Sequence, residues 1–233
     1  MPSTNTLPDW WYDDLTQVGL DFADSIQVAT YDDRQRGSAS EDRALLRSLG
    51  VTRTTAIADI GCGTGILVCE AADQARSVRA IDISPAMLAA TKVRAEGLGL
   101  SNIAYEQAGF LTFAASGDLD LIISKNALHH LPDMWKAVAL TRLRDALRHG
   151  GRIYIRDVAF NCAPDALPRA VESWAAQMAR DSGYSRNDVA THVRDEHSTF
   201  SWVITRMIEE AGFRVLSHRH EGVYGTWLAE AVM

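Results

Sequence analysis

The chain lacks several features that would assign it to a class at once. Its 233 residues include three cysteines, Cys62, Cys69 and Cys162, with no Cys-x-x-Cys pair, so neither a zinc site nor a disulfide framework is indicated. No apolar run approaches the roughly 20 residues that cross a membrane. Residues 1–10 are polar and contain two prolines, unlike a signal peptide. We therefore expect a cytoplasmic protein with no membrane partner and no metal.

Positive charge is also scarce. Lys and Arg number 23 against 30 Asp and Glu, a net charge of −7, and no basic run is present. A surface that follows a phosphate backbone needs clustered Lys and Arg, so nucleic acid is not expected as a partner. Hydrophobic residues make up 47% and charged residues 23%, which is typical of a globular domain with a sizeable core.

Short apolar runs alternate with segments of helical periodicity, a pattern typical of βαβ units and a parallel sheet. Ser84-Pro85 marks a helix start, with a serine N-cap and proline at the first helical position. We expect buried strands at 56–60, 78–83, 119–124 and 151–158, a weaker strand at 103–106, and helices at 66–75, 85–98 and 133–147, the last ending at Gly150-Gly151.

Other segments extend beyond this alternation. Trp11, Leu15, Val18 and Phe22 have the spacing of an amphipathic helix, as do Leu167, Val171, Trp174 and Met178. A further helix is expected at 200–211, and two strands at 213–218 and 223–229. We predict an N-terminal helical cap over 1–50 and a second unit over 51–233, which carries a helical lid insertion at 160–199, since long insertions in compact domains are usually functional or disordered.

The most informative segment is Ala58-Asp59-Ile60-Gly61-Cys62-Gly63-Thr64-Gly65, which follows an apolar run. Glycines between a strand and a helix let the backbone approach a ligand that a Cβ would exclude. Asp82 follows Gly61 by 21 residues and ends the next apolar run. A carboxylate there can accept hydrogen bonds from a ribose diol. Because Asp59 would repel a pyrophosphate, the loop favours a cationic nucleoside ligand.

In these residues the chain resembles the class I S-adenosylmethionine (SAM)-dependent methyltransferases, which carry an acidic residue before a G-x-G-x-G loop and another that closes strand two. The resemblance covers roughly residues 52–160 and implies an α/β, doubly wound, seven-stranded sheet, mostly parallel with one antiparallel strand, plus N-terminal helices and a helical lid insertion. It implies SAM as cofactor and S-adenosylhomocysteine (SAH) as product.

The resemblance also implies which residues hold the cofactor. Asp82 would bind the ribose, Ile83 and Phe110 the adenine, and the glycine loop the methionine moiety. One departure concerns Gly109, which stands where many relatives have an acidic residue that contacts the adenine amino group; a backbone carbonyl or Gln107 would have to replace it. The predicted cofactor-binding residues are Tyr31, Asp59, Gly61, Cys62, Gly63, Gly65, Asp82, Ile83, Met87, Gly109, Phe110, Lys125 and Asn126.

Residues 120–133 read DLIISKNALHHLPD and look like the fourth-strand motif of small-molecule methyltransferases. His129 or His130 could deprotonate a hydroxyl, phenol or amine, because the histidine pKa is ordinarily near neutral. The alternative is that this pair only positions the loop and the cofactor. Glu196 and His197, in the insertion, are expected on the surface, and contact with the substrate is the alternative.

Aromatic residues concentrate in the extra segments and predict a pocket for a flat or apolar small molecule. The expected activity is methyl transfer to O, N or C of a small acceptor that is aromatic or carries an amine, mainly by proximity and orientation. A nucleotide-dependent oxidoreductase, a non-catalytic SAM- or SAH-binding module, and a methyltransferase acting on a polymer are the alternatives; a homodimer is also open. The predicted substrate-binding residues are Trp11, Trp174, His197, Trp202 and Tyr224.

Overall fold

The sheet of this protein follows the order β3-β2-β1-β4-β5-β8-β7. The computed structural model describes residues 8–16, 38–181 and 184–232. Six strands of this order are parallel and β8 alone runs antiparallel, between β5 and β7, which confirms the predicted fold. The strands are β1 Ala56–Ile60, β2 Ser77–Asp82, β3 Ile103–Gln107, β4 Leu119–Lys125, β5 Leu147–Phe160, β7 Phe213–Glu221 and β8 Tyr224–Ala231.

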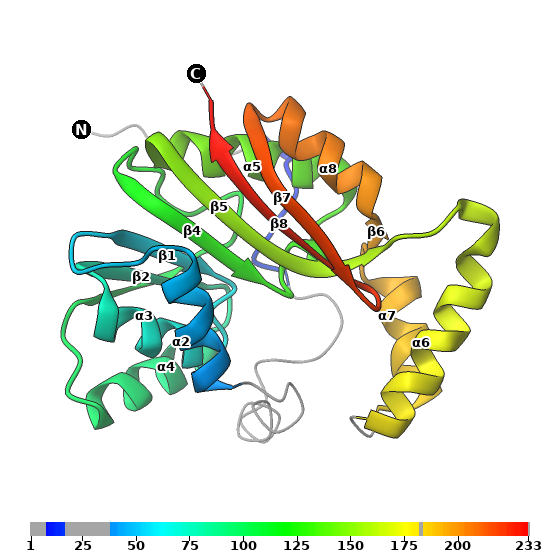
Figure 1. Ribbon diagram of the computed structural model, residues 1–233, viewed down its shortest axis with the longest axis horizontal. Helices are drawn as coiled ribbons and strands as arrows, with labels where there is room; N and C mark the ends of the chain where they lie inside the picture. The colour runs from blue at the N-terminus through cyan, green and yellow to red at the C-terminus, as the bar shows by residue number, and fades with distance from the viewer. Residues whose placement is uncertain (1–7, 17–37, 182–183, 233) are drawn as a thin grey trace.

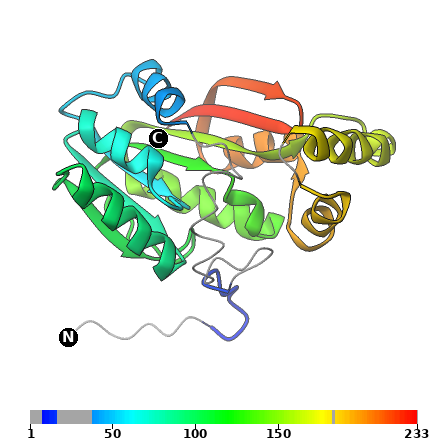
Figure 2. The same cartoon turned by 90° about the horizontal axis from the view of Figure 1, so that it is seen from below.

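Helices cover both faces of the sheet (Figures 1 and 2). On one face α2 (Ala39–Ser48) and α3 (Ile66–Gln74) pack on β1 and β4 around a core that includes Leu46, Val68 and Ile123. Helix α4 (Pro85–Gly97) lies on the same side, next to α3. On the other face α5 (Asp133–Ala146) and α8 (Ser201–Glu210) enclose the larger core. None of the described helices is long and apolar enough to span a membrane.

The helix starts follow the local sequence. The Ser84 hydroxyl accepts a hydrogen bond from Met87 N at 3.3 Å, and Pro85 occupies the first helical position of α4, as predicted. Helix α5 ends at Ala146, one residue before its predicted end. The predicted stop at Gly150-Gly151 was wrong, because both glycines lie inside β5, which begins at Leu147.

A helical insertion follows β5 and stands away from the sheet (Figure 1). It comprises the short turn η2 (Pro164–Ala166), α6 (Leu167–Asp181), α7 (Arg186–Asp195) and the two-residue strand β6 (Thr199–Phe200), which pairs with the end of β5. Helix α6 was predicted, whereas α7 was not. The insertion has its own small core, in which Trp174 and Val189 pack on Val158 and Phe160.

The N-terminal segment differs from its prediction within residues 8–16. These residues form turns and not the start of a helix through Trp11 and Leu15. Asp13 explains the difference, because its carboxylate accepts hydrogen bonds from Leu15 N (3.1 Å) and from the Thr16 hydroxyl (3.0 Å) and so competes with helical pairing. The rest of that predicted helix lies outside the described residues.

Candidate functional site

The glycine loop lies at the carboxyl end of β1. Gly61 and Gly65 have φ of +76° and +80°, a conformation that other residues adopt only with strain. A Cβ on Gly61 would overlap the Cβ of Ala127, and one on Gly65 would overlap the Thr91 side chain. Thr91 in turn donates a hydrogen bond to Gly63 O at 2.8 Å. The loop is therefore clamped between α4 and the segment that follows β4.

Asp82 ends β2 directly beside this loop. Its Oδ2 accepts a hydrogen bond from Gly63 N (2.8 Å) and its Oδ1 one from Ser84 N (2.9 Å). Burial raises the pKa of Asp82, and these backbone donors oppose the rise. A carboxylate oxygen can accept about two hydrogen bonds, so each oxygen keeps capacity for a ligand hydroxyl.

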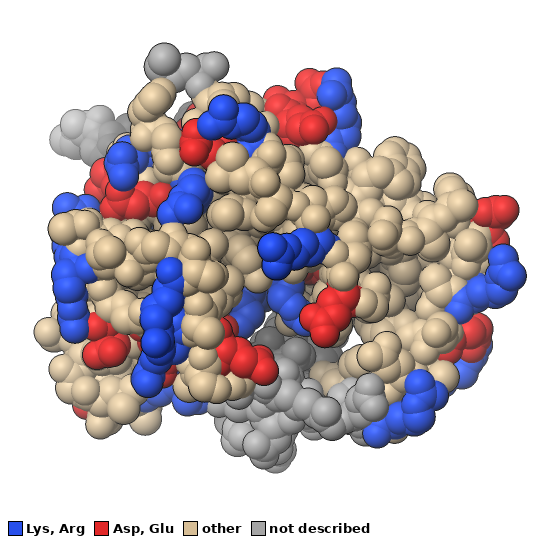
Figure 3. All heavy atoms as spheres, in the orientation of Figure 1, with Lys and Arg blue, Asp and Glu red and all other residues tan. Residues whose placement is uncertain are grey.

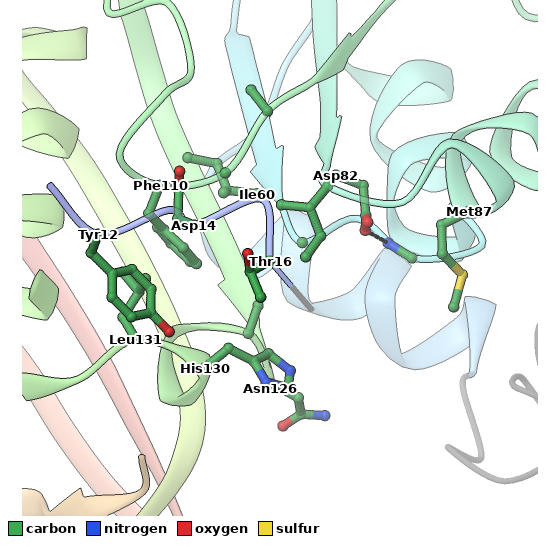
Figure 4. A pocket seen from close by; sticks show the side chains of 16 residues that line it. Tyr12, Asp14, Thr16, Ile60, Asp82, Met87, Phe110, Asn126, His130 and Leu131 are labelled. Carbon is green, nitrogen blue, oxygen red and sulfur yellow. Dashed lines mark hydrogen bonds between the residues drawn. The ribbon is translucent and has the colours of Figure 1, made fainter. Parts of the chain in front are cut away.

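A cavity opens between the glycine loop, the ends of β2 and β3, and the N-terminal segment (Figure 4). Ile83, Met87 and Phe110 give it apolar walls, while Asp82 and Asn126 give it polar groups. We call it the first cavity. Its lining residues are Tyr12, Asp14, Thr16, Ile60, Gly61, Gly63, Asp82, Ile83, Met87, Ala108, Gly109, Phe110, Asn126, Ala127, His130 and Leu131.

A second, larger cavity lies on the other side of the loop, between α2 and the insertion. The face drawn in Figure 3 is hollowed in this region, and Lys and Arg alternate there with Asp and Glu. Gly61, Gly63 and Asn126 line both cavities, so the two meet at the loop. The other lining residues of the second cavity are Ser38, Glu41, Asp42, Leu45, Asp59, Cys62, Thr64, Ile66, Leu67, Lys125, Tyr154, Arg156, Trp174, Gln177, Met178, Glu221, Gly222, Val223 and Tyr224.

Like Asp42, Asp59 is a buried acid of this second cavity. Burial raises its pKa to about 7, although the Lys125 charge nearby lowers it. Lys125 itself forms a 2.5 Å ion pair with Asp42 of α2. A cationic ligand group beside Asp59 would favour its ionised form.

His129 is held between two carboxylates. Its Nδ1 lies 2.5 Å from Asp157 Oδ1, and its Nε2 lies 3.1 Å from Glu196 Oε2. Burial lowers the pKa of His129, but the two carboxylates raise it more, to about 9. Glu196 also pairs with His192 of α7. The expectation that Glu196 lies on the surface was wrong: it is 9% exposed and connects the insertion to the sheet.

His130 stands in a different environment. Its ring centroid lies 4.2 Å from that of His129, and it lines the first cavity. Burial and the positive charge on His129 lower the pKa of His130 to about 3. His130 is therefore a neutral imidazole at pH 7, and His129 an imidazolium.

Donor atoms of His129, His130 and Glu196 lie within 4.8 Å of one another, the one such group of three or more potential metal ligands among the described residues. The ring nitrogens of His129 are both hydrogen-bonded to carboxylates, so its position is accounted for by these pairs. The prediction that the protein holds no metal stays a prediction.

The predicted substrate residues are dispersed. Trp174 and Tyr224 line the second cavity, and the Arg156 guanidinium lies 3.9 Å over the Tyr224 ring. Trp11 packs edge-on against Trp135 in the large core.

Two of the predicted residues lie elsewhere. Trp202 is 61% exposed and stacks on Phe200, and neither it nor His197 lines the first or the second cavity. Trp227 is fully buried and donates to the Thr205 hydroxyl. The aromatic residues therefore do not gather into one pocket. Tyr31 lies outside the described residues.

Comparison with known proteins finds a matching family model, methyltransferase relatives and solved structures of similar fold. A family model for a methyltransferase domain matches residues 57–151. An uncharacterized methyltransferase of Geobacillus sp. (strain WCH70) is 28% identical over 215 residues, 91% of this chain and 94% of the relative.

Two solved structures are similar over most of their length. A SAM-dependent methyltransferase from Aquifex aeolicus has a TM-score of 0.66 at 19% identity, covering 90% of this chain and 99% of that one. The N-methyltransferase NodS from Bradyrhizobium japonicum WM9, solved with SAH, has a TM-score of 0.59 at 17% identity, covering 86% and 87%. In fold, in loop sequence and in these matches, the chain is similar to class I SAM-dependent methyltransferases, which supports SAM as its cofactor.

Proposed function

We propose that this protein transfers a methyl group from SAM to O, N or C of a small-molecule acceptor, with the adenosyl group in the first cavity and the acceptor in the second. The observation that carries this proposal is the junction of the two cavities at Gly61, Gly63 and Asn126. A reacting methyl group placed at that junction would face the second cavity.

The buried polar groups match the donors of SAM. Asp82 has acceptor capacity for the two ribose hydroxyls, and Asp59 can face the ammonium group of the methionine moiety. Ile83 and Phe110 supply apolar surface for adenine. The positive φ values of the loop let the backbone approach the ligand without a Cβ.

When bound, SAM supplies a methyl group that its sulfonium already activates. The chain then has to orient the acceptor at near-attack distance and exclude water. Trp174 and Tyr224 line the acceptor cavity and suit a flat or amine-bearing molecule. His130 lines the first cavity and its pKa of about 3 makes it a weak base, so we assign it a role in positioning the loop and the cofactor and assign transfer mainly to orientation of the acceptor. His129, with both ring nitrogens engaged, would hold the segment in place.

We further propose that residues 1–50 cap the SAM-binding domain and that the insertion acts as a lid on the acceptor cavity. The three free thiols Cys62, Cys69 and Cys162 support a reducing compartment such as the cytoplasm. A homodimer stays a prediction.

The test is a transfer assay with methyl-labelled SAM and a panel of small aromatic and amine acceptors, read as labelled product and SAH. Transfer to at least one acceptor, with an affinity that changes little with added salt, is the expected result. A polymer acceptor would instead lose affinity steeply with salt. Binding of SAM without transfer to any acceptor would favour a non-catalytic SAM-binding module. If NAD(P), and not SAM, bound and protected the protein, an oxidoreductase would be favoured.

A further inference from the structure

A buried carboxylate of the N-terminal segment reaches the first cavity from outside the parallel sheet. Asp14 is 6% exposed and lines this cavity. Figure 4 shows the segment crossing the cavity at Asp14 and Thr16, near the loop that carries Phe110. Asp14 Oδ2 accepts a hydrogen bond from Leu111 N at 2.6 Å, which fixes the carboxylate against that loop.

The second oxygen of the same carboxylate, Oδ1, is buried and has no hydrogen-bond partner among the described residues. Burial raises the Asp14 pKa, although interaction of the carboxylate with the Leu111 backbone and with the Thr112 side chain lowers it. A buried acceptor without a donor costs free energy, and native structures hold few of them. Such an atom at the wall of a ligand cavity is explained if a ligand supplies the missing donor.

Gly109 makes room for this arrangement. A Cβ built on Gly109 would lie 2.8 Å from Asp14 Cγ and closer still to Oδ2. A side chain at position 109 and the Asp14 carboxylate would therefore compete for the same space. The φ of Gly109 lies outside the left-handed range, so the glycine is required by this contact and not by its backbone conformation.

SAM has three groups that donate hydrogen bonds: the ribose hydroxyls, the methionine ammonium and the 6-amino group of adenine. The proposed function, on which this inference rests, places the first two at Asp82 and Asp59. We propose that Asp14 accepts the third, so that the N-terminal segment supplies the carboxylate that recognises the adenine amino group, in place of a side chain at position 109.

Asp14→Asn tests this by changing the base that the site prefers. An asparagine that keeps its oxygen on Leu111 N places an amide donor where the Oδ1 acceptor was. That donor opposes a 6-amino group and suits the 6-carbonyl of hypoxanthine. The probes are SAH and S-inosylhomocysteine, its deaminated analogue, titrated calorimetrically into the full chain. Asp9→Asn is the matched control, because it removes the same charge from an exposed residue of the same segment.

We expect the wild-type protein and Asp9→Asn to prefer SAH. Asp14→Asn should weaken SAH binding about ten- to a hundred-fold, as expected for loss of a hydrogen bond to a charged group, and should bind S-inosylhomocysteine more tightly than the wild type does. Hydrogen exchange of residues 8–16 should slow on SAH binding in the wild type and not in Asp14→Asn.

A rescue variant guards against simple loss of structure. Asp14→Ala with Gly109→Asp moves the carboxylate to the loop and removes the two Asp14 atoms nearest to the added Cβ, Oδ2 and Cγ, which leaves the backbone oxygen of residue 14 at 3.1 Å. It should recover the preference for SAH that Asp14→Ala alone loses.

Three results would overturn the inference. Unchanged SAH affinity in Asp14→Asn would show that the carboxylate does not contact the base. Equal loss of both ligands without rescue would show that Asp14 only braces Leu111. Binding of neither ligand by the wild type would remove the cofactor placement itself, a failure distinct from the other two.

Discussion

Asp82→Ala is the substitution that most directly tests where the cofactor ribose binds. The change removes a carboxylate whose two oxygens already accept Gly63 N and Ser84 N and retain capacity for two hydroxyls. A hydrogen bond to a charged group contributes about 1.5–3 kcal/mol. Because the two ribose contacts share one carboxylate and do not add fully, we expect SAH affinity to fall by about 2–3 kcal/mol, or roughly 30- to 150-fold.

Calorimetric titration with SAH gives this number directly, with a thermal melt of each variant beside it. Ser84→Ala is the control: it removes the cap of α4 at Met87 N and about 1 kcal/mol of stability, yet leaves the Asp82 carboxylate. Its SAH affinity should stay near the wild-type value. An unchanged affinity in Asp82→Ala, or an equal loss in Ser84→Ala, would refute the reasoning.

Three further predictions follow from buried groups and close contacts. Because the pKa of Asp59 is raised to about 7, SAM affinity should fall as the pH drops from 7 to 5.5, by up to about tenfold per pH unit below that pKa. The SAM affinity of Asp59→Asn should not change with pH over this range. If this variant kept the pH dependence of the wild type, Asp59 would not be the group that faces the SAM ammonium. Glu196→Gln removes one carboxylate from the buried histidine network and should lower the stability of the insertion by about 3 kcal/mol. Hydrogen exchange should then become faster in α7 than in the sheet; an equal change in both would contradict the idea that Glu196 holds the insertion on the sheet. Gly225→Ala would drive a Cβ into the fully buried Trp227 ring and should lower the free energy of unfolding in urea by about 1–3 kcal/mol. Gly97→Ala, in helix α4 with nothing within 4 Å of the added Cβ, should raise it by up to about 1 kcal/mol; a loss of stability equal to that of Gly225→Ala would contradict the packing argument.

Short-range signals allowed most of the sheet to be predicted. The run Ala56–Ile60 is a strand with the predicted bounds, because all five residues are buried and flanked by turn residues. The Ser84-Pro85 start of α4 followed from chemistry within three residues. Predictions were less accurate where a competing interaction lay nearby: Asp13 draws the N-terminal segment into a turn, and Gly150-Gly151, a helix stop by composition, lies within β5.

The candidate site divides in the same way. The loop from Gly61 to Gly65 and Asp82 could be found from the sequence, since their spacing is set by one βαβ unit. Asp14 could not, because 95 residues separate it from Gly109 and only the fold brings the two together. Glu196 could not either, since nothing in its neighbourhood in the sequence shows that it meets His129.

A structure of the protein with SAH bound tests the central claim most directly. The account predicts adenine beside Ile83 and Phe110 in the first cavity, the ribose hydroxyls on Asp82, and the sulfur at the junction of the two cavities, facing the second. An adenosyl group seated elsewhere, or a sulfur that points away from the second cavity, would contradict the placement of both cofactor and acceptor.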